Sequence, residues 1–290
     1  MKPKIAYQGE PGANSHIACL EVCPDFEPLP CRTFEDAFQA VKEGVAKLAM
    51  IPIDNSVAGR VADIHHLMPA SNLAIIGEHF LPIHFHLLAV PGASLKGLKT
   101  VHSHVHALGQ CRKMIKAHKL TPVVAIDTAG AARELSESKD KTSSALATAL
   151  AGELYGLEPL LKNIEDEAHN TTRFIILSTE RRDAPAGNGP VMTSFVFRVR
   201  NVPAALYKAM GGFATNGVNM TKLESYQLEG QFSATQFYAD IEGHPEDRNV
   251  RLALEELAFF SSYTKILGTY PASPIRAEIA KRMVGDSLAN

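Results

Sequence analysis

The chain has 290 residues, of which 46% are apolar and 21% charged, and its net charge is −2. This length allows about two domains, and the composition is that of an ordinary globular protein. The near-neutral charge argues against a nucleic-acid partner, and no apolar run approaches the ~20 residues that span a bilayer. We expect a cytoplasmic protein with reduced cysteines, because the start lacks a signal-peptide pattern and the four cysteines show no pairing pattern.

A polar segment at residues 179–190, with two glycines and two prolines, divides the chain into two parts. In the first part, short apolar runs alternate with helical patterns, which predicts an α/β fold with a largely parallel sheet. The expected strands are residues 5–8, 48–53, 73–76, 85–90, 123–126 and 174–177. The expected helices are residues 14–22, 34–42, 105–119 and 129–136.

The second part shows a strand-helix-strand-strand-helix-strand pattern. The expected strands are residues 193–199, 218–226, 232–239 and 263–267, with a turn at 228–230. Apolar residues at helical spacing mark the helices: Leu206, Met210 and Phe213, then Val250, Ala253, Leu254 and Leu257. The βαββαβ order predicts a small ferredoxin-like sandwich over residues 191–272. In the tail, residues 273–290, Ile275, Ile279 and Met283 indicate a short amphipathic helix or a frayed end.

A glycine-containing loop joins the first expected strand to the first expected helix. Gly12 and Ala13 lie in this loop, where glycine lets the backbone approach a ligand. The N-terminus of the following helix offers backbone amides to an anion. The alternative is a tight turn in which Asn14 or Ser15 caps the helix.

Polar residues also follow the expected strand at residues 48–53. Asn55 and Ser56 come just beyond its carboxyl end, the position at which open α/β sheets bind ligands. The alternative is again a helix cap.

A third polar segment spans residues 101–111. We expect Ser103 to start a helix and Gln110 to lie two turns later, near the same face. Three histidines stand here at every second position: His102, His104 and His106. They need not converge, and no carboxylate or cysteine partner lies at zinc-like spacing, so we expect solvated or capping histidines and no metal.

A fourth polar segment, residues 169–173, leads into the strand that begins at Phe174. Thr172 supplies a hydroxyl donor, and Arg173 supplies a guanidinium that matches carboxylates. On its own, this segment also fits an ordinary strand start with an exposed arginine.

In this order and at these separations, the segments resemble prephenate dehydratases over nearly the whole chain. The matching motifs are Gly9-x-Pro11-Gly12, Pro52-x-Asp54-Asn55-Ser56-x-x-Gly59, Ser103-x6-Gln110-Cys111, Tyr155-Gly156-Leu157 and Asn170-x-Thr172-Arg173-Phe174. The resemblance implies a catalytic domain at residues 1–180, two-lobed like periplasmic binding proteins, with prephenate in the cleft. Its lobes would be roughly residues 1–78 plus 172–180, and 79–171. It further implies an ACT domain at 191–272 and a homodimer or homotetramer.

The chemistry of that family needs no cofactor. Prephenate loses CO2 and water from opposite ring carbons and becomes aromatic, so the enzyme has to hold the anion and help hydroxide leave. The resemblance implies that Thr172 is the donor to the leaving hydroxyl and that Asn55, Ser103 and Gln110 complete the catalytic set. It implies substrate binding at Ser56, Gly12, Ala13, Arg173 and Phe174.

The second part departs from the pattern of phenylalanine-sensing ACT domains. Alanine stands at 204 where the family's Gly-Ala-Leu motif has glycine, and Tyr226-Gln227 replaces the Arg-Pro of its Glu-Ser-Arg-Pro motif. A Cβ at 204 would crowd a backbone-bound amino acid. We still expect L-phenylalanine to bind between ACT domains of neighbouring subunits, at Ala204, Ala205, Leu206, Asn216, Asn219, Glu224 and Ser225.

Three other interpretations stay open. The nearest is arogenate dehydratase or dual specificity, since arogenate differs only by an amino group in place of the keto group. A non-catalytic two-lobed binding module would be expected to carry a signal peptide or a DNA-binding helix-turn-helix. A pure amino-acid sensor leaves the first ~180 residues without a role. No chorismate mutase segment is recognised before the first strand, so a monofunctional enzyme is expected.

Overall fold

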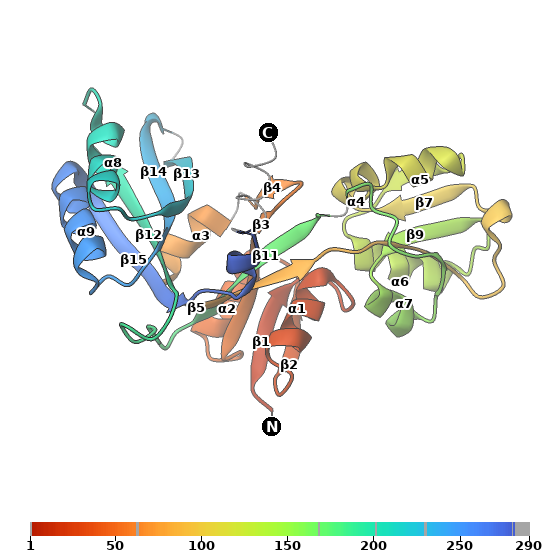
Figure 1. The fold of residues 1–290 in the computed structure, drawn as a ribbon. Helices are drawn as coiled ribbons and strands as arrows, with labels where there is room; N and C mark the ends of the chain where they lie inside the picture. Colours follow the sequence, from red (N-terminus) through yellow and green to blue (C-terminus); the bar gives the residue numbers. More distant parts are fainter. Residues whose placement is uncertain are drawn as a thin grey trace. The chain divides into compact units, whose positions relative to one another are not determined.

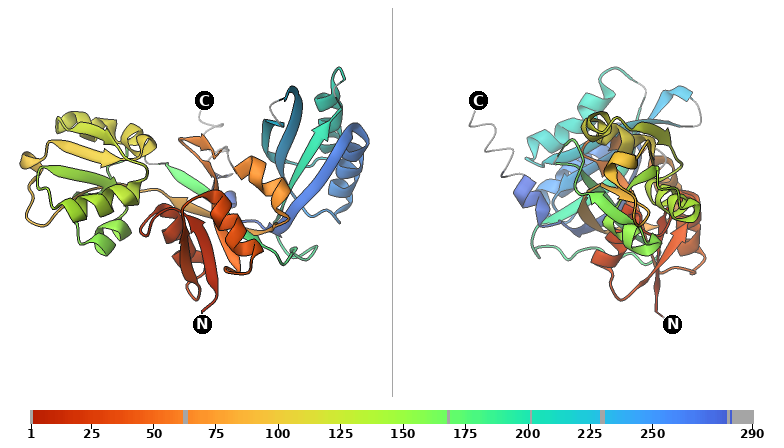
Figure 2. Two further views of the ribbon diagram at one scale, coloured as in Figure 1. Left: turned by 180° about the vertical axis from the view of Figure 1, so that it is seen from behind. Right: turned by 90° about the vertical axis from the view of Figure 1, so that its right-hand side faces the viewer.

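The computed structural model describes residues 2–61, 64–167, 169–200, 202–228, 231–279 and 281 (Figures 1 and 2). The chain forms two compact units: residues 1–61 with 79–174, and residues 62–78 with 175–290. These units are defined by packing alone, so the domain bounds inferred from the resemblance stay a prediction. None of the helices in the described ranges is long and apolar enough to cross a membrane.

The first unit begins with a sheet of strand order β2-β1-β3-β11-β5. Strand β1 pairs in parallel with β2 and β3, and the short β4 is antiparallel to β3. Strands β11 and β5 belong to this unit through residues 171–174 and 79–82. The bounds are β1 Lys4–Gln8, β2 Glu27–Cys31, β3 Leu48–Asn55, β4 Gly59–Arg60, β5 Ala74–Pro82 and β11 Thr171–Ser178.

Two helices, α1 (Asn14–Val22) and α2 (Phe34–Lys42), have the bounds predicted from the sequence. A capping box fixes the start of α2, because the Thr33 hydroxyl accepts the Asp36 N–H and the Asp36 carboxylate accepts the Thr33 N–H. Local signals of this kind make a helix start readable from sequence.

The remainder of the first unit holds a second sheet, of order β10-β6-β9-β7-β8. Its strands are β6 His86–Ala89, β7 Thr100–Ser103, β8 Thr121–Val124, β9 Ser143–Ala147 and β10 Glu158–Leu161. Its helices are η1 Leu95–Gly97, α4 Val105–Gln110, α5 Arg112–Ala117, α6 Thr128–Ser138 and α7 Ala149–Tyr155. The expectation of a largely parallel sheet was wrong here. Strands β6 and β10 run antiparallel to their neighbours, and only β7, β8 and β9 pair in parallel.

The single helix expected at residues 105–119 is divided at Cys111, whose φ of −126° and ψ of 29° are not helical. The Asp166 N–H donates to the Gln110 carbonyl at 2.6 Å, and the Asp166 carboxylate accepts the Lys113 N–H at 3.1 Å. A side chain 53 residues away in the chain thus caps α5. The expectation that Ser103 starts a helix was also wrong, since Ser103 ends β7 and His104 is the N-cap of α4.

The second unit confirms the predicted βαββαβ order. Its sheet has the order β13-β14-β12-β15, and all its pairings are antiparallel. Helices α8 and α9 lie on one face (Figure 1), where Phe195, Phe197 and Phe213 anchor the core. The bounds are β12 Val191–Val199, α8 Ala205–Thr215, β13 Met220–Leu228, β14 Gln231–Glu242, α9 Arg248–Phe260 and β15 Ser261–Pro271. In the tail, residues 275–279 are helical. Positions 229 and 230 of the expected turn, and Met283, lie outside the described residues.

The other face of this sheet carries helix α3 (Ile64–Ser71), which no sequence pattern had indicated. Its His65 is 2% exposed and lies against the rings of Tyr226 and Tyr238, at centroid distances of 5.8 and 5.2 Å. The Lys265 ammonium donates to the Pro69 carbonyl at 2.8 Å. A short segment from the first half of the chain is therefore built into the C-terminal unit.

Gly268, on β15, packs closely against the backbone of Ile75, on β5. A Cβ at Gly268 would lie 2.0 Å from the carbonyl oxygen of Ile75, a backbone atom that cannot move aside alone. We expect Gly268→Ala to lower the free energy of unfolding by about 3 kcal/mol, measured by urea titration. Gly211→Ala is the matched control, because its Cβ would meet nothing nearer than 3.7 Å. An equal effect of the two substitutions would contradict this close packing.

Candidate functional site

Four polar side chains in the first unit form one hydrogen-bonded chain. Gln110, at the end of α4, accepts from the Asn170 amide through Oε1 at 2.7 Å. Asn170 in turn accepts from Asn55 Nδ2 at 2.8 Å, and the same nitrogen donates to the Thr172 hydroxyl oxygen at 2.9 Å. Residues from β3, α4 and the start of β11 thereby meet at one point.

The direction of these bonds determines what the site can donate. Because Asn55 donates to Thr172 Oγ1, the hydroxyl hydrogen of Thr172 is left to point elsewhere. Gln110 uses its amide oxygen, which leaves both hydrogens of its amide nitrogen. Neither donor has a further side-chain partner within the described part of the chain, so each can bind an acceptor.

The turn after β3 is fixed by its own side chains. Asn55 Oδ1 accepts the N–H groups of Val57 at 3.0 Å and Ala58 at 2.7 Å. The Ser56 hydroxyl donates to the His169 carbonyl at 2.7 Å and accepts the Thr171 N–H at 2.9 Å. Asn55 is therefore held from both ends of its side chain, and Thr172 is positioned through it.

Thr172, Asn55 and Gln110 line a cavity of about 320 Å³. The first turn of α1 also lines it, through Ala13, Asn14 and Ser15. Ala13, the N-cap, makes no side-chain hydrogen bond to this helix end, which leaves first-turn N–H groups for an anion. Among the described residues, no group of three histidine, cysteine or acidic side chains is arranged to hold a metal.

A family model described as prephenate dehydratase matches residues 5–182. The chain belongs to the prephenate dehydratase family. A bifunctional N-acyl-homoserine lactone acylase/prephenate dehydratase of Komagataeibacter europaeus is 52% identical over 272 residues, 94% of this chain and 97% of the relative. An arogenate dehydratase/prephenate dehydratase of Arabidopsis thaliana is 36% identical over 289 residues, 95% of this chain and 74% of the relative.

A solved prephenate dehydratase from Arthrobacter aurescens, in complex with L-Phe, has the same fold. Its TM-score is 0.85 at 30% identity, with 99% of this chain and 100% of that chain covered. This likeness confirms the two-lobed α/β fold that the sequence predicted. As a member of the prephenate dehydratase family, the chain is a carbon–oxygen lyase.

Several residues inferred from the prephenate dehydratase motifs are buried and do not line the cavity. Ser103 is fully buried and donates to the Leu146 carbonyl at 2.7 Å. Arg173 is 6% exposed, with its guanidinium 3.8 Å from the Asp54 carboxylate, and Phe174 belongs to the core. The substrate roles inferred for these three residues stay predictions.

Gly12 is also absent from the cavity wall, and the structure shows what it does instead. Its φ is +92°, and a Cβ would lie 2.7 Å from Ala151 Cα. The Gly12 carbonyl accepts from the Thr148 hydroxyl at 2.5 Å, and the Pro11 carbonyl accepts from the Tyr155 hydroxyl at 2.9 Å. Two separate family motifs thus meet to fix the loop that precedes α1.

The role of Asn170 was missed by the sequence analysis, although the residue stands in a quoted motif. Asn170 is 3% exposed, does not line the cavity and joins Gln110 to Asn55. The available signal was an asparagine close before an apolar strand, whose amide can both donate and accept hydrogen bonds.

His16 gives the site a pH-dependent element. Burial lowers the pKa of His16 below 6.5, and its neutral Nδ1 accepts the Gly12 N–H at 3.0 Å. The unfolded chain binds the extra proton first, so this contribution to stability is present above about pH 6.5 and lost as pH falls. We expect the unfolding free energy to fall less between pH 7 and 5 in His16→Gln than in the wild type. Exposed His118→Gln is the control, and an unchanged slope in His16→Gln would contradict the assignment.

Proposed function

We propose that the protein is a prephenate dehydratase that converts prephenate to phenylpyruvate, CO2 and water. The observation that carries the proposal is the hydrogen bond from Asn55 to the Thr172 hydroxyl oxygen, because it leaves the hydroxyl hydrogen of a cavity-lining residue available for donation. Threonine is a poor Brønsted acid, so it would act as a positioned donor to the departing hydroxide. Gaining an aromatic ring drives the reaction, and no step requires a metal or nucleophile.

In this scheme the other donors hold the anion. The Gln110 amide and the first turn of α1 line the same cavity as Thr172 and suit carboxylate or hydroxyl oxygens.

The test is formation of phenylpyruvate from prephenate by purified protein in the presence of a chelator. We expect multiple turnovers with a chelator present, and no phenylpyruvate above the uncatalysed rate would refute the proposal.

A second activity is proposed because of the K. europaeus relative, whose description includes N-acyl-homoserine lactone acylase. Because the two sequences are 52% identical over nearly the full length of both chains, we expect a shared activity. Donors that stabilise a leaving hydroxide also suit the oxyanion formed during amide hydrolysis. Mass spectrometry of an N-acyl-homoserine lactone incubated with the protein should show free homoserine lactone. Unchanged substrate would reject this second activity alone.

We further propose that L-phenylalanine binds the βαββαβ unit, as an ACT domain, and inhibits the enzyme. The A. aurescens relative is described as a complex with L-Phe, which supports an effector of this class. The expected positions lie at the start of α8, between α8 and β13, and within β13: Ala204, Ala205, Leu206, Asn216, Asn219, Glu224 and Ser225. Calorimetry with L-phenylalanine, and light scattering to find a dimer or tetramer, test this proposal. No heat and no rate change at millimolar L-phenylalanine would reject it.

The unusual alanine at 204 gives a separate prediction. Ala204 has a φ of +60°, a left-handed conformation that costs an L-residue about 1 kcal/mol relative to glycine. We expect Ala204→Gly to raise the free energy of unfolding by up to about 1 kcal/mol, and to strengthen L-phenylalanine binding by removing the Cβ. Val202→Gly in the same loop should not stabilise the protein. A destabilised Ala204→Gly would contradict the strain.

A further inference from the structure

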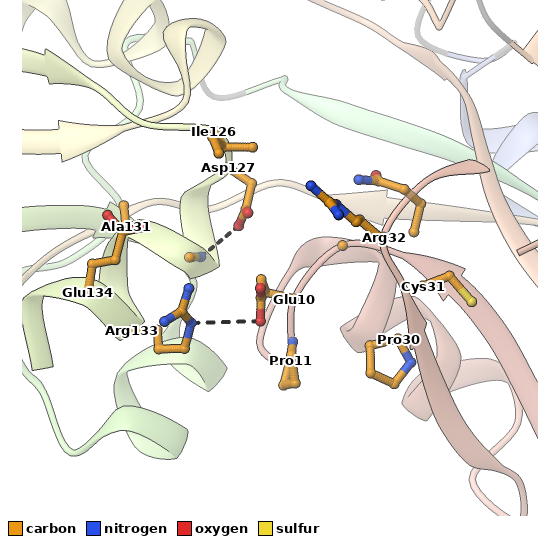
Figure 3. Close-up of a pocket in the computed structure, with 13 residues that line it drawn as sticks. Glu10, Pro11, Pro30, Cys31, Arg32, Ile126, Asp127, Ala131, Arg133 and Glu134 are labelled. Carbon is orange, nitrogen blue, oxygen red and sulfur yellow. Dashed lines mark hydrogen bonds and ion pairs between the residues drawn. The ribbon is translucent and has the colours of Figure 1, made fainter. Parts of the chain in front are cut away.

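Figure 3 shows a second cavity in the first unit, whose volume is about 430 Å³. The two cavities share four wall residues: Gln8, Gly9, Ile126 and Asp127. Arg32, directly after β2, and Arg133, on α6, line the second cavity from different segments. Figure 3 shows the Arg32 guanidinium pointing into this space.

The two arginines differ in whether an acidic side chain pairs with their charge. Arg133 lies 3.0 Å from the Glu137 carboxylate and 3.9 Å from that of Glu10. Arg32 has no hydrogen bond or ion pair with any described residue. Of the residues that the structure describes, no arginine or lysine lines the Thr172 cavity. Within the described residues, Arg32 is thus the one arginine or lysine facing either cavity whose charge is unpaired.

Three acidic side chains also line the second cavity, and two of them interact with other residues. Glu10 lies beside Arg133, and one oxygen of Asp127 caps α6 by accepting the Gly130 N–H at 2.6 Å. Glu134 is exposed. The Arg32 guanidinium is therefore available to donate two hydrogen bonds to a carboxylate that extends from the Thr172 cavity.

Prephenate has a ring carboxylate and a side-chain carboxylate, and the chemistry of the reaction favours a cation bound to the side-chain carboxylate. The ring carboxylate of prephenate departs as CO2, and a cation bound to it would stabilise the ground state more than the transition state. The side-chain carboxylate stays throughout, so binding it costs nothing in rate. With the ring hydroxyl at Thr172, the side chain is at the opposite ring carbon and would extend past the shared wall toward Arg32.

We propose that Arg32 binds the side-chain carboxylate of the substrate and sets a preference for a 2-oxo side chain over a 2-amino one. This rests on the proposed function. The guanidinium donates to the carboxylate and can also donate to the keto oxygen, but it repels the ammonium group of arogenate. The chain would accordingly act on prephenate more efficiently than on arogenate.

The first test is Arg32→Gln, which removes the charge at an exposed position and should not impair folding. We expect KM for prephenate to rise about tenfold or more, on the scale of a hydrogen bond to a charged group, with kcat within about threefold. Arg32→Lys should recover part of the loss. Arg112→Gln is the matched control, an exposed arginine outside both cavities. A kcat/KM for Arg32→Gln within about threefold of wild type would overturn the proposal.

The second test compares kcat/KM on prephenate and arogenate. The ratio in favour of prephenate should fall at least about fivefold in Arg32→Gln, and further in Arg32→Asp. An unchanged ratio would overturn the assigned preference. Wild-type protein inactive on both substrates would instead refute the proposed function, so the two failures are distinguishable.

Discussion

Replacing Thr172 with valine should lower kcat on prephenate by about 10²–10³, the range for losing a positioned donor to developing negative charge. Valine keeps the shape of threonine but removes the hydroxyl that Asn55 orients. The loss should therefore fall on kcat with little change in KM, because the donor matters most as hydroxide leaves. Thr172→Ser keeps a hydroxyl and should retain activity within about tenfold of the wild type.

Thr171→Val is the matched control for this substitution. Thr171 precedes Thr172 in β11, so its side chain points to the other face of the strand, and it does not line the cavity. We expect kcat for Thr171→Val within about threefold of the wild type. A Thr172→Val variant with near-wild-type kcat and a normal unfolding curve would remove Thr172 from the mechanism.

Local signals made much of the fold predictable. Helix α2 begins with a capping box, and the βαββαβ order follows from apolar spacing alone. Asn55 and Thr172 were named from motifs 117 positions apart, and they share a hydrogen bond. The motifs therefore named three residues that line one cavity, Asn55, Gln110 and Thr172, although they carried no information on the direction of the hydrogen bonds.

Distant contacts account for what the sequence did not reveal. The break at Cys111 depends on Asp166, and α3 is held by aromatic and lysine contacts with the C-terminal unit. Neither the helix break nor helix α3 can be predicted from the local spacing of apolar residues. Ser103 and Arg173 were expected at the substrate, and that role stays a prediction; in the structure Ser103 donates to the Leu146 carbonyl and Arg173 lies beside Asp54. A polar residue at a strand end can face either way, and only the packed sheet decides which.

Replacing Asn170 with alanine should be nearly as damaging as replacing Thr172. The change leaves an Asn55 amide hydrogen and the Gln110 oxygen without their partner, at a cost of about 1–3 kcal/mol in stability. Both donors to the cavity would lose their fixed orientation, so we expect kcat to fall about 10²-fold at temperatures where the variant is folded. His169→Ala is the control, since its exposed side chain can be removed while its carbonyl still accepts from Ser56.

A double variant separates positioning from mere destabilisation. Asn170 does not line the cavity, so its effect has to pass through Asn55 to Thr172 and through Gln110. Asn170→Ala combined with Thr172→Val should consequently lose much less than the product of the two single losses, because the second change removes a donor that the first has already disordered. Multiplied losses in the double variant would mean that Asn170 acts independently of Thr172, and the hydrogen-bonded chain would then not be the unit that prepares the site.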